Sequence, residues 1–383
     1  MQRLPKKSVF SRNYSSTTDP MLKPTIIATL NCLLLFIGQS ASAQISDPSF
    51  ESNGHFGFFI ANQPKSLYLR NAHSRLIEIN VSRQTTGKKS WERENNYPRL
   101  GIALMYGDLG SKQYLGSMTA IYPFIHFPLL RTRRSVSSFR LGAGLGWVEK
   151  PYDKEDNYKN LMIGTHMNAT ISMRLQTEWR IVHGLYMNAG LAFTHLSNGS
   201  YRLPNLGLNI PTIAAGLRYG PEASSIPRKR QREAHIRKTS LFIFAGGAFK
   251  QTYPLESTVH LIRIANFELA RSLSPVSSVN AGILISHDKS LSNEIANAPT
   301  YIFDNSELQL QASAYLGYEH IVGRLSIPIQ LGVYLYNNYA TSQIYQLIGL
   351  RYRISGKWLM SLQLKAHYGK ADYIQYAIGY KIF

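Results

Sequence analysis

The sequence predicts an all-β protein, a transmembrane antiparallel β-barrel of the bacterial outer membrane with about 12 to 16 strands. Segments of roughly ten residues alternate apolar and polar side chains, which is the pattern and length of a tilted strand that crosses a bilayer. One such segment places Leu310, Ala312 and Ala314 on one face and Gln309, Gln311 and Ser313 on the other. No long apolar run follows the first 43 residues, so a bundle of membrane helices is excluded. Strands in hydrocarbon must close into a barrel, because unpaired backbone groups are not tolerated there.

The amino terminus predicts export across the inner membrane. Lys23 precedes an apolar stretch at 26–38, which is followed by small residues that end at Ala43. This order of charged, apolar and small residues is typical of a secretory signal peptide. We therefore expect residues 1–43 to form an N-terminal extension and signal peptide, with cleavage after Ala43.

Cysteine content and charge limit the chemistry and the partners. The only cysteine is Cys32, inside the predicted signal peptide, so the mature chain would have no disulfide and no thiol nucleophile. The chain carries 42 Lys and Arg against 22 Asp and Glu, a net charge of +20. Such a charge favours an anionic partner, and export favours phospholipid or lipopolysaccharide over nucleic acid.

The predicted strands follow one another along the chain in two groups. They lie near 55–61, 74–83, 97–107, 112–124, 138–148, 161–176, 184–196 and 209–220, and then near 239–250, 257–270, 276–287, 306–320, 324–336, 340–354, 357–368 and 372–383. An even strand number returns both termini to the periplasm. In that orientation the seventh strand runs outward and ends at the outer leaflet.

A basic connector at 221–238 separates the two groups and contains Arg228, Lys229 and Arg230. We interpret it as a solvated turn that can touch anionic headgroups, since export disfavours nucleic acid. It also raises the alternative of an eight-stranded barrel followed by a second barrel. We favour a single barrel over 44–383, with 239–383 as additional strands, because the alternation resumes directly after the connector.

The seventh and eighth predicted strands bring together residues of a hydrolytic site. His195 and Ser197 continue the apolar row of Leu191 and Phe193, since residues two apart point to the same face of a strand. Asn209 has the parity of the apolar row of the next strand. A serine becomes a useful nucleophile when a base takes its proton, and that base needs an acceptor to hold its tautomer. All three residue types therefore occupy one lipid-facing surface.

The segment 195–199, with the Pro-Asn-x-Gly loop at 204–207, resembles the lipid A 3-O-deacylase (PagL) family and related outer-membrane acyloxyacyl hydrolases. The resemblance covers about residues 45–220. It implies an outer-membrane barrel that hydrolyses an ester-linked acyl chain of lipopolysaccharide without a metal or other cofactor.

The same resemblance implies roles for individual residues. Ser197 would be the nucleophile and His195 its general base, while Asn198 and Gly199 would supply oxyanion donors. The third member of the family's triad is an acidic residue, and Asn209 stands at its position. An asparagine can orient the histidine but offers no charge to stabilise the imidazolium.

Two functional hypotheses follow. The first is a serine esterase of the cell outer membrane that deacylates lipid A. The second is a noncatalytic barrel, a porin or structural protein that retains the motif. A pore requires a wide polar lumen, which about sixteen strands provide and eight do not. The other histidines show no metal-ligand spacing, and there is no nucleotide-binding motif.

Overall fold

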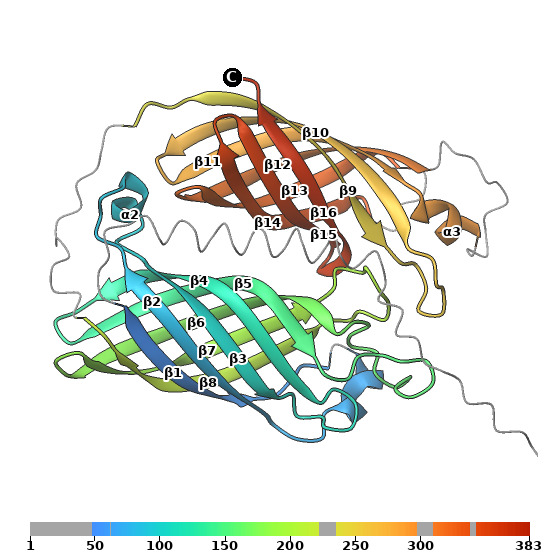
Figure 1. The fold of residues 1–383 in the computed structure, drawn as a ribbon. Coiled ribbons are helices and arrows are strands. Elements are labelled where there is room, and N and C mark those ends of the chain that lie inside the picture. Colours follow the sequence, from blue (N-terminus) through green and yellow to red (C-terminus); the bar gives the residue numbers. More distant parts are fainter. Residues whose placement is uncertain (1–47, 62, 222–234, 297–308, 338–341) are drawn as a thin grey trace, which may run out of the picture.

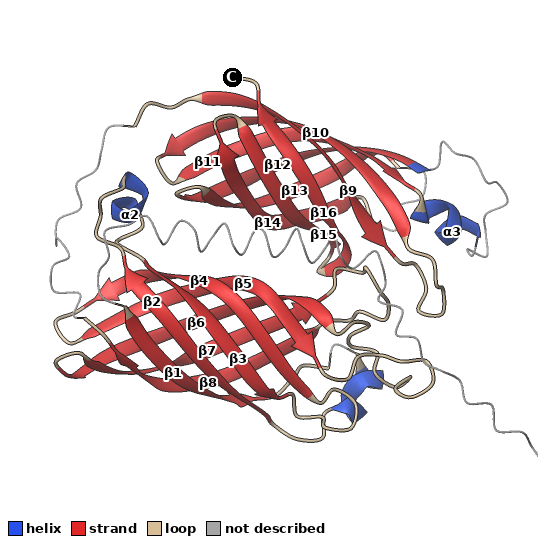
Figure 2. Cartoon of the chain, in the orientation of Figure 1, coloured by secondary structure: helices blue, strands red, loops and turns tan. Residues whose placement is uncertain are grey.

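A computed structural model of the chain describes residues 48–61, 63–221, 235–296, 309–337 and 342–383. The predicted signal peptide, its cleavage point and most of the basic connector lie outside the described residues. The described part is an all-β protein with a few short helices (Figure 2). None of its helices has the length and apolar character needed to cross a membrane.

Two closed barrels of eight antiparallel strands each make up the described residues (Figure 1). The first contains β1 (Ser49–Gly57), β2 (Ser74–Gln84), β3 (Arg99–Asp108), β4 (Ser117–Arg131), β5 (Ser135–Val148), β6 (Met167–Val182), β7 (Leu185–Ser197) and β8 (Leu208–Tyr219). The second contains β9 (Thr239–Lys250), β10 (His260–Ser274), β11 (Ser277–Asp288), β12 (Leu310–Val322), β13 (Leu325–Tyr336), β14 (Ile344–Ser355), β15 (Trp358–His367) and β16 (Lys370–Lys381). The connections carry the 3-10 helix η1 (Pro64–Leu69) and the helices α2 (Ser90–Glu94) and α3 (Ser290–Ala296).

The single barrel of about 12 to 16 strands that the sequence favours is therefore wrong. Each predicted segment overlaps one observed strand, but the strands close in two groups. β1 pairs with β8, where Phe50 lies opposite Tyr219, and β16 pairs with β9, where Gln375 lies opposite Ala248. Since each group of eight satisfies its own edge strands, neither needs the other to complete its backbone hydrogen bonds.

Charged side chains occupy the interior of the first barrel. Arg140 and Arg174 both pair with Glu78, and Arg174 also lies 2.8 Å from Glu51. These side chains are almost completely buried. Eight strands leave an interior just wide enough for side chains. The polar half of the period-two pattern thus forms a packed ionic core.

The second barrel repeats this arrangement. Arg351 pairs with Glu268 at 2.6 Å and with Glu319 at 2.9 Å, all three buried inside the barrel. The apolar half of the pattern faces outward in both barrels. Leu191 is 64% exposed and Leu316 is 70% exposed, although both are large aliphatic residues. The outer surface of each barrel is therefore an apolar belt, as the alternation predicts.

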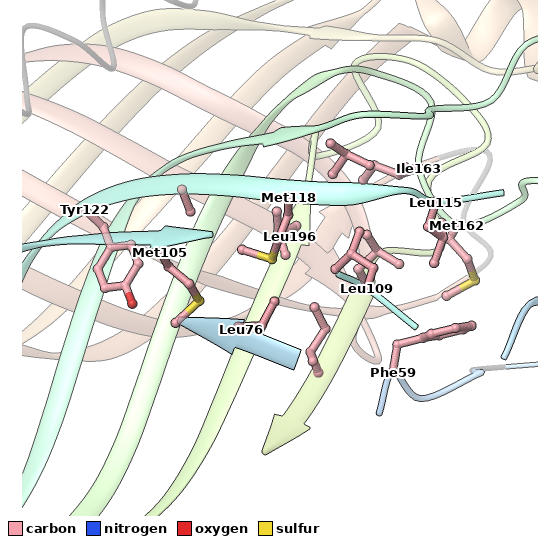
Figure 3. Packing of buried hydrophobic residues seen from close by; sticks show 14 of the residues in the cluster. Phe59, Leu76, Met105, Leu109, Leu115, Met118, Tyr122, Met162, Ile163 and Leu196 are labelled. Carbon is pink, nitrogen blue, oxygen red and sulfur yellow. The ribbon is translucent and has the colours of Figure 1, made fainter. Parts of the chain in front are cut away.

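An apolar cluster closes one end of the first barrel. We call the end where β7 finishes the distal end, and the end where β1 begins the proximal end. Figure 3 shows Phe59, Leu109, Leu115, Met162 and Ile163 from the distal loops packed with Leu196 from β7. All of these side chains are fully buried. The distal loops are thereby fixed to the barrel wall beneath them.

The two barrels lie side by side with the same ends aligned (Figure 1). At the distal end, the hydroxyl of Ser200 donates a hydrogen bond to the carbonyl oxygen of Ala371 at 2.9 Å. At the proximal end, His320 of β12 contacts Asn95, where Nε2 and Oδ1 are 2.9 Å apart. The ring of Phe127 also packs edge-on against His320. Contacts at both ends therefore hold the two barrels next to each other, with their distal ends pointing in the same direction.

Candidate active site at the distal end of β7 and β8

The register of β7 and β8 places His195 directly opposite Asn209. Nδ1 of His195 lies 2.7 Å from Oδ1 of Asn209. Because an amide oxygen only accepts hydrogen bonds, Nδ1 is the donor and Nε2 keeps its lone pair. A general base needs this tautomer. Both side chains have outward-facing parity, as the sequence predicts for these strands.

Ser197 lies on the same face as His195 but does not bond to it. Two residues along a strand span about 6.6 Å, so contact requires the side chains to lean toward each other. In the described residues, the Ser197 hydroxyl oxygen instead accepts the backbone N–H of Gly199 at 3.1 Å, and no hydrogen bond joins Ser197 to His195. Catalytic hydrogen bonds often tighten only when substrate is bound. The structure thus assembles the His195–Asn209 pair, while Ser197 lies on the same face and is bonded to Gly199 instead.

The two residues predicted to supply oxyanion donors differ in their surroundings. The backbone N–H of Gly199 donates to Oγ of Ser197 at 3.1 Å. The backbone N–H of Asn198 instead donates to Oδ1 of Asn205 at 3.2 Å. The Gly199 N–H is therefore the better placed donor, while Asn198 is engaged within its own loop.

The side chain of Asn198 ties that loop to a neighbouring one. Its amide nitrogen donates to the hydroxyl of Thr165 at 3.1 Å and to the carbonyl of Arg202 at 2.8 Å. The Pro-Asn-x-Gly motif already marks Asn205 in the sequence. Thr165 falls in the segment 161–176 that the sequence predicts as a strand, but β6 begins only at Met167, so the sequence does not mark Thr165 as a loop residue of the site.

Inward-facing neighbours hold the site strands in place. Leu196 and Leu208 alternate with the site residues, are fully buried, and pack in the distal apolar cluster. Gly207 adopts a φ of +77°, and a Cβ there would lie 2.8 Å from Cε1 of His195. Glycine is therefore required at this position both for the backbone and for room beside the imidazole.

Acidic, histidine and cysteine side chains do not gather around this site. Within the described part of the chain, no group of three or more of them is arranged to hold a metal ion. The chemistry available at the distal end is that of a histidine held by an amide, a nearby serine hydroxyl and a backbone N–H.

These features define a β-barrel protein with a candidate serine hydrolase site on its outer wall. A family model described as Lipid A 3-O-deacylase (PagL) matches residues 76–218. A second, described as Acyloxyacyl hydrolase, C-terminal domain, matches residues 239–383. The chain belongs to the PagL family and carries both of its regions, which confirms the resemblance found in the sequence. The second barrel is thus a family region in its own right.

The matches among solved structures are distant. A Rhodopseudomonas blastica porin triple mutant shares 8% identity, with 88% of this chain and 100% of that chain covered and a TM-score of 0.17. The siderophore receptor PirA from Pseudomonas aeruginosa shares 11% identity over 88% of this chain and 62% of the receptor, with a TM-score of 0.21. PirA from Acinetobacter baumannii shares 9% identity over 84% and 43%, also with a TM-score of 0.21. No curated protein matches the chain.

Proposed function

We propose that the protein is a serine esterase of the outer membrane that hydrolyses an ester-linked acyl chain of lipid A. The observation that carries the proposal is the hydrogen bond between His195 and Asn209 on an outward-facing wall, two residues from Ser197. Membership of the PagL family supports lipid A deacylation in general. The outward position suits a substrate whose ester lies at the edge of the hydrocarbon layer.

The mechanism follows from the three side chains. His195 Nε2 takes the proton of Ser197 Oγ as that oxygen attacks the ester carbonyl carbon. The carbonyl oxygen becomes an oxyanion, which accepts the N–H of Gly199. The protonated histidine then donates its proton to the leaving alkoxide of the sugar, and an acyl-enzyme remains. Water, deprotonated by the same histidine, releases the fatty acid.

The basic composition supports an anionic lipid as the partner. The net charge of +20 favours a phosphorylated glycolipid over a neutral one. Arg202 lies in the loop after Ser197, where its guanidinium donates to the carbonyl of Ser257 at 3.2 Å, so a phosphate at this loop would share an arginine that is already held in place. The substrate would therefore present its phosphates to the distal loops and its acyl chains to the outer wall.

A noncatalytic pore is the competing function, and the lumen argues against it. Arg140, Arg174 and Glu78 form a buried ionic cluster across the first barrel, and Arg351 does the same with Glu268 in the second. Eight strands leave no room for a wide channel beside such side chains. A wide pore would require a single large barrel, whereas the described strands of this chain close into two barrels of eight.

Mass spectrometry of lipid A from cells that carry the wild type, Ser197→Ala or His195→Ala tests the proposal. We expect the wild type to remove one ester-linked acyl chain and both variants to leave it in place. Ser137→Ala is the matched control, because Ser137 also faces outward on the first barrel but lies near its proximal end. If a strain that lacks the protein gives the same acylation pattern as strains with the wild type and with each of the three variants, the esterase is ruled out.

A further inference from the structure

The loop that follows the nucleophile is bound to the second barrel. We call residues 198–207 the site loop. The backbone N–H of Gln251 donates to the carbonyl of Ser200 at 3.0 Å, and the side-chain oxygen of Gln251 accepts the N–H of Leu203 at 2.6 Å. Gln251 is only 2% exposed. With the bond from Ser200 to Ala371, these contacts fix the site loop from both sides of the β9–β16 seam.

A side chain of β16 reaches Gly199, two residues after Ser197. A Cβ placed on Gly199 would lie 2.3 Å from Cγ1 of Ile374, so the two residues are in direct contact. Gly199 is the same residue whose N–H bonds to Ser197 Oγ. Ser197 is 6% exposed, whereas Leu191 on the same outward row is 64% exposed. The outer wall is therefore exposed at Leu191, in the middle of β7, and buried at Ser197, at its distal end.

We propose that the active site is shared between the two barrels: Gln251 positions the site loop, and Ile374 lines the path of the acyl chain and sets which chain is accepted. This inference rests on the proposed esterase function. An ester carbonyl at Ser197 Oγ would direct its acyl chain along the outward faces, because these carry the exposed apolar side chains of each barrel. Ile374 is the branched apolar side chain of the second barrel that stands beside that point.

Selectivity between acyl chains tests the role of Ile374. The assay compares hydrolysis of two lipid A substrates in mixed detergent micelles, one with a short and one with a long ester-linked chain. Ile374→Trp should lower the long-to-short rate ratio about tenfold, and Ile374→Ala should raise it, since changes of this size in an apolar site alter discrimination by that order. Ile378→Trp and Ile378→Ala are matched controls, because Ile378 faces outward four residues further along β16 and is 45% exposed.

The outcomes test the esterase function and the shared site separately. An inactive wild type overturns the esterase itself. An active wild type whose Ile374 variants both keep the original ratio overturns the shared site. Heat-dependent mobility on a gel reports whether each variant is folded, and Ile374→Ala decides the question if the tryptophan variant does not fold.

Gln251 is a positioning residue, and its test separates turnover from binding. Gln251→Ala should lower kcat about tenfold with KM nearly unchanged, because the loop that carries the Gly199 N–H loses its anchor. Gln251→Glu keeps an acceptor for the Leu203 N–H but loses the donor to the carbonyl of Glu256, so it should restore part of kcat. Equal kcat values for the alanine and glutamate variants would contradict this role.

A cysteine pair tests the contact without any activity. In the full chain, Ser200→Cys with Ala371→Cys should form a disulfide that appears as a linked peptide in mass spectrometry, since the Ser200 hydroxyl already touches Ala371. Ser200→Cys with Ile378→Cys is the control and should stay reduced. A control pair that links as readily as the test pair, or a test pair that does not link, overturns the shared site even if the wild type is active.

Discussion

At the scale of single residues, Asn209 stands where the resemblance to the family implies an acidic residue. Its oxygen holds the His195 ring in the tautomer that a base requires, at 2.7 Å. A carboxylate would do the same and would also stabilise the imidazolium that forms when the serine is deprotonated. The orientation of the histidine is thus kept, and the electrostatic contribution is absent.

Two substitutions at Asn209 measure these contributions separately. Asn209→Ala should lower the rate of fatty acid release about a hundredfold, because the imidazole loses its fixed tautomer. Asn209→Glu should raise the rate about tenfold above wild type, since it adds a charge opposite the imidazolium. Release of free fatty acid from lipopolysaccharide vesicles gives both rates. Full activity of the alanine variant would mean that another group orients His195.

Gly207 offers a test of how closely the loop fits the histidine. Gly207→Ala costs about 1–2 kcal/mol from its left-handed backbone, and its new methyl group would also displace the imidazole. Gly356→Ala is the matched control, with a φ of +50° and open space around its Cβ. Both variants should lose similar stability in urea, but only Gly207→Ala should lose most of its esterase activity. Similar activities would contradict a steric role beside His195.

At the scale of elements, the strands of the first barrel are joined through buried ion pairs. Glu78 on β2 meets Arg140 on β5 and Arg174 on β6, so one carboxylate connects three strands across the lumen. Each charge is tolerated there only because its partners are present. The inward-facing polar residues of these strands thus stabilise the fold by pairing with each other, and they do not line a water-filled channel.

Removal of one partner should therefore be costly. Arg140→Met leaves Glu78 with less compensation, and we expect it to lower the free energy of unfolding by about 3–5 kcal/mol. Adding Glu78→Gln to the same protein should recover part of that loss, because no unpaired charge remains. Urea unfolding in detergent micelles, followed by tryptophan fluorescence, gives both values. A double variant less stable than Arg140→Met would contradict this account.

The sequence predicts most strands well because alternation is a local property. Three strands are displaced by several residues: β4, expected at 112–124 and observed at Ser117–Arg131, β6, expected at 161–176 and observed at Met167–Val182, and β1, expected at 55–61 and observed at Ser49–Gly57. β1 is the most informative of them. Glu51, Asn53 and His55 point into the lumen and pair there, while its outward row includes Ser52 and Gly54. An inward row of polar residues opposite a weak apolar row has no clear period, so the strand is recognisable only once its partners are known. In contrast, parity alone predicts that His195 and Asn209 share the outward face, and the register of β7 and β8 then pairs them.

At the scale of the whole molecule, closure is a property of strand pairs. The same alternation is compatible with one large barrel or two small ones, because it does not specify which strands meet at the seam. Pairing of β8 with β1 decides the matter, and it depends on register between segments far apart in sequence. For the same reason, parity places His195 and Ser197 on one face but cannot predict that Ile374 contacts Gly199, two residues after Ser197.

The aligned ends of the two barrels predict a common topology in the membrane. If the proposed outer-membrane location holds, the loop at 149–166 of the first barrel and the loop at 251–259 of the second should both face the cell exterior. Lys154→Cys and Leu255→Cys place a single exposed thiol in each loop, since Cys32 lies in the predicted signal peptide. Both variants should react with a membrane-impermeant maleimide on intact cells.

Thiols at the proximal end provide the control for this experiment. Arg133→Cys lies in the β4–β5 turn and Gly356→Cys in the β14–β15 turn, and both positions are exposed. They should react only after the outer membrane is permeabilised. Labelling of Lys154→Cys but not Leu255→Cys on intact cells would mean that the barrels insert in opposite senses. That result would separate the site loop from Gln251 and Ile374 by the thickness of the membrane, so the shared site depends on both distal loops being labelled.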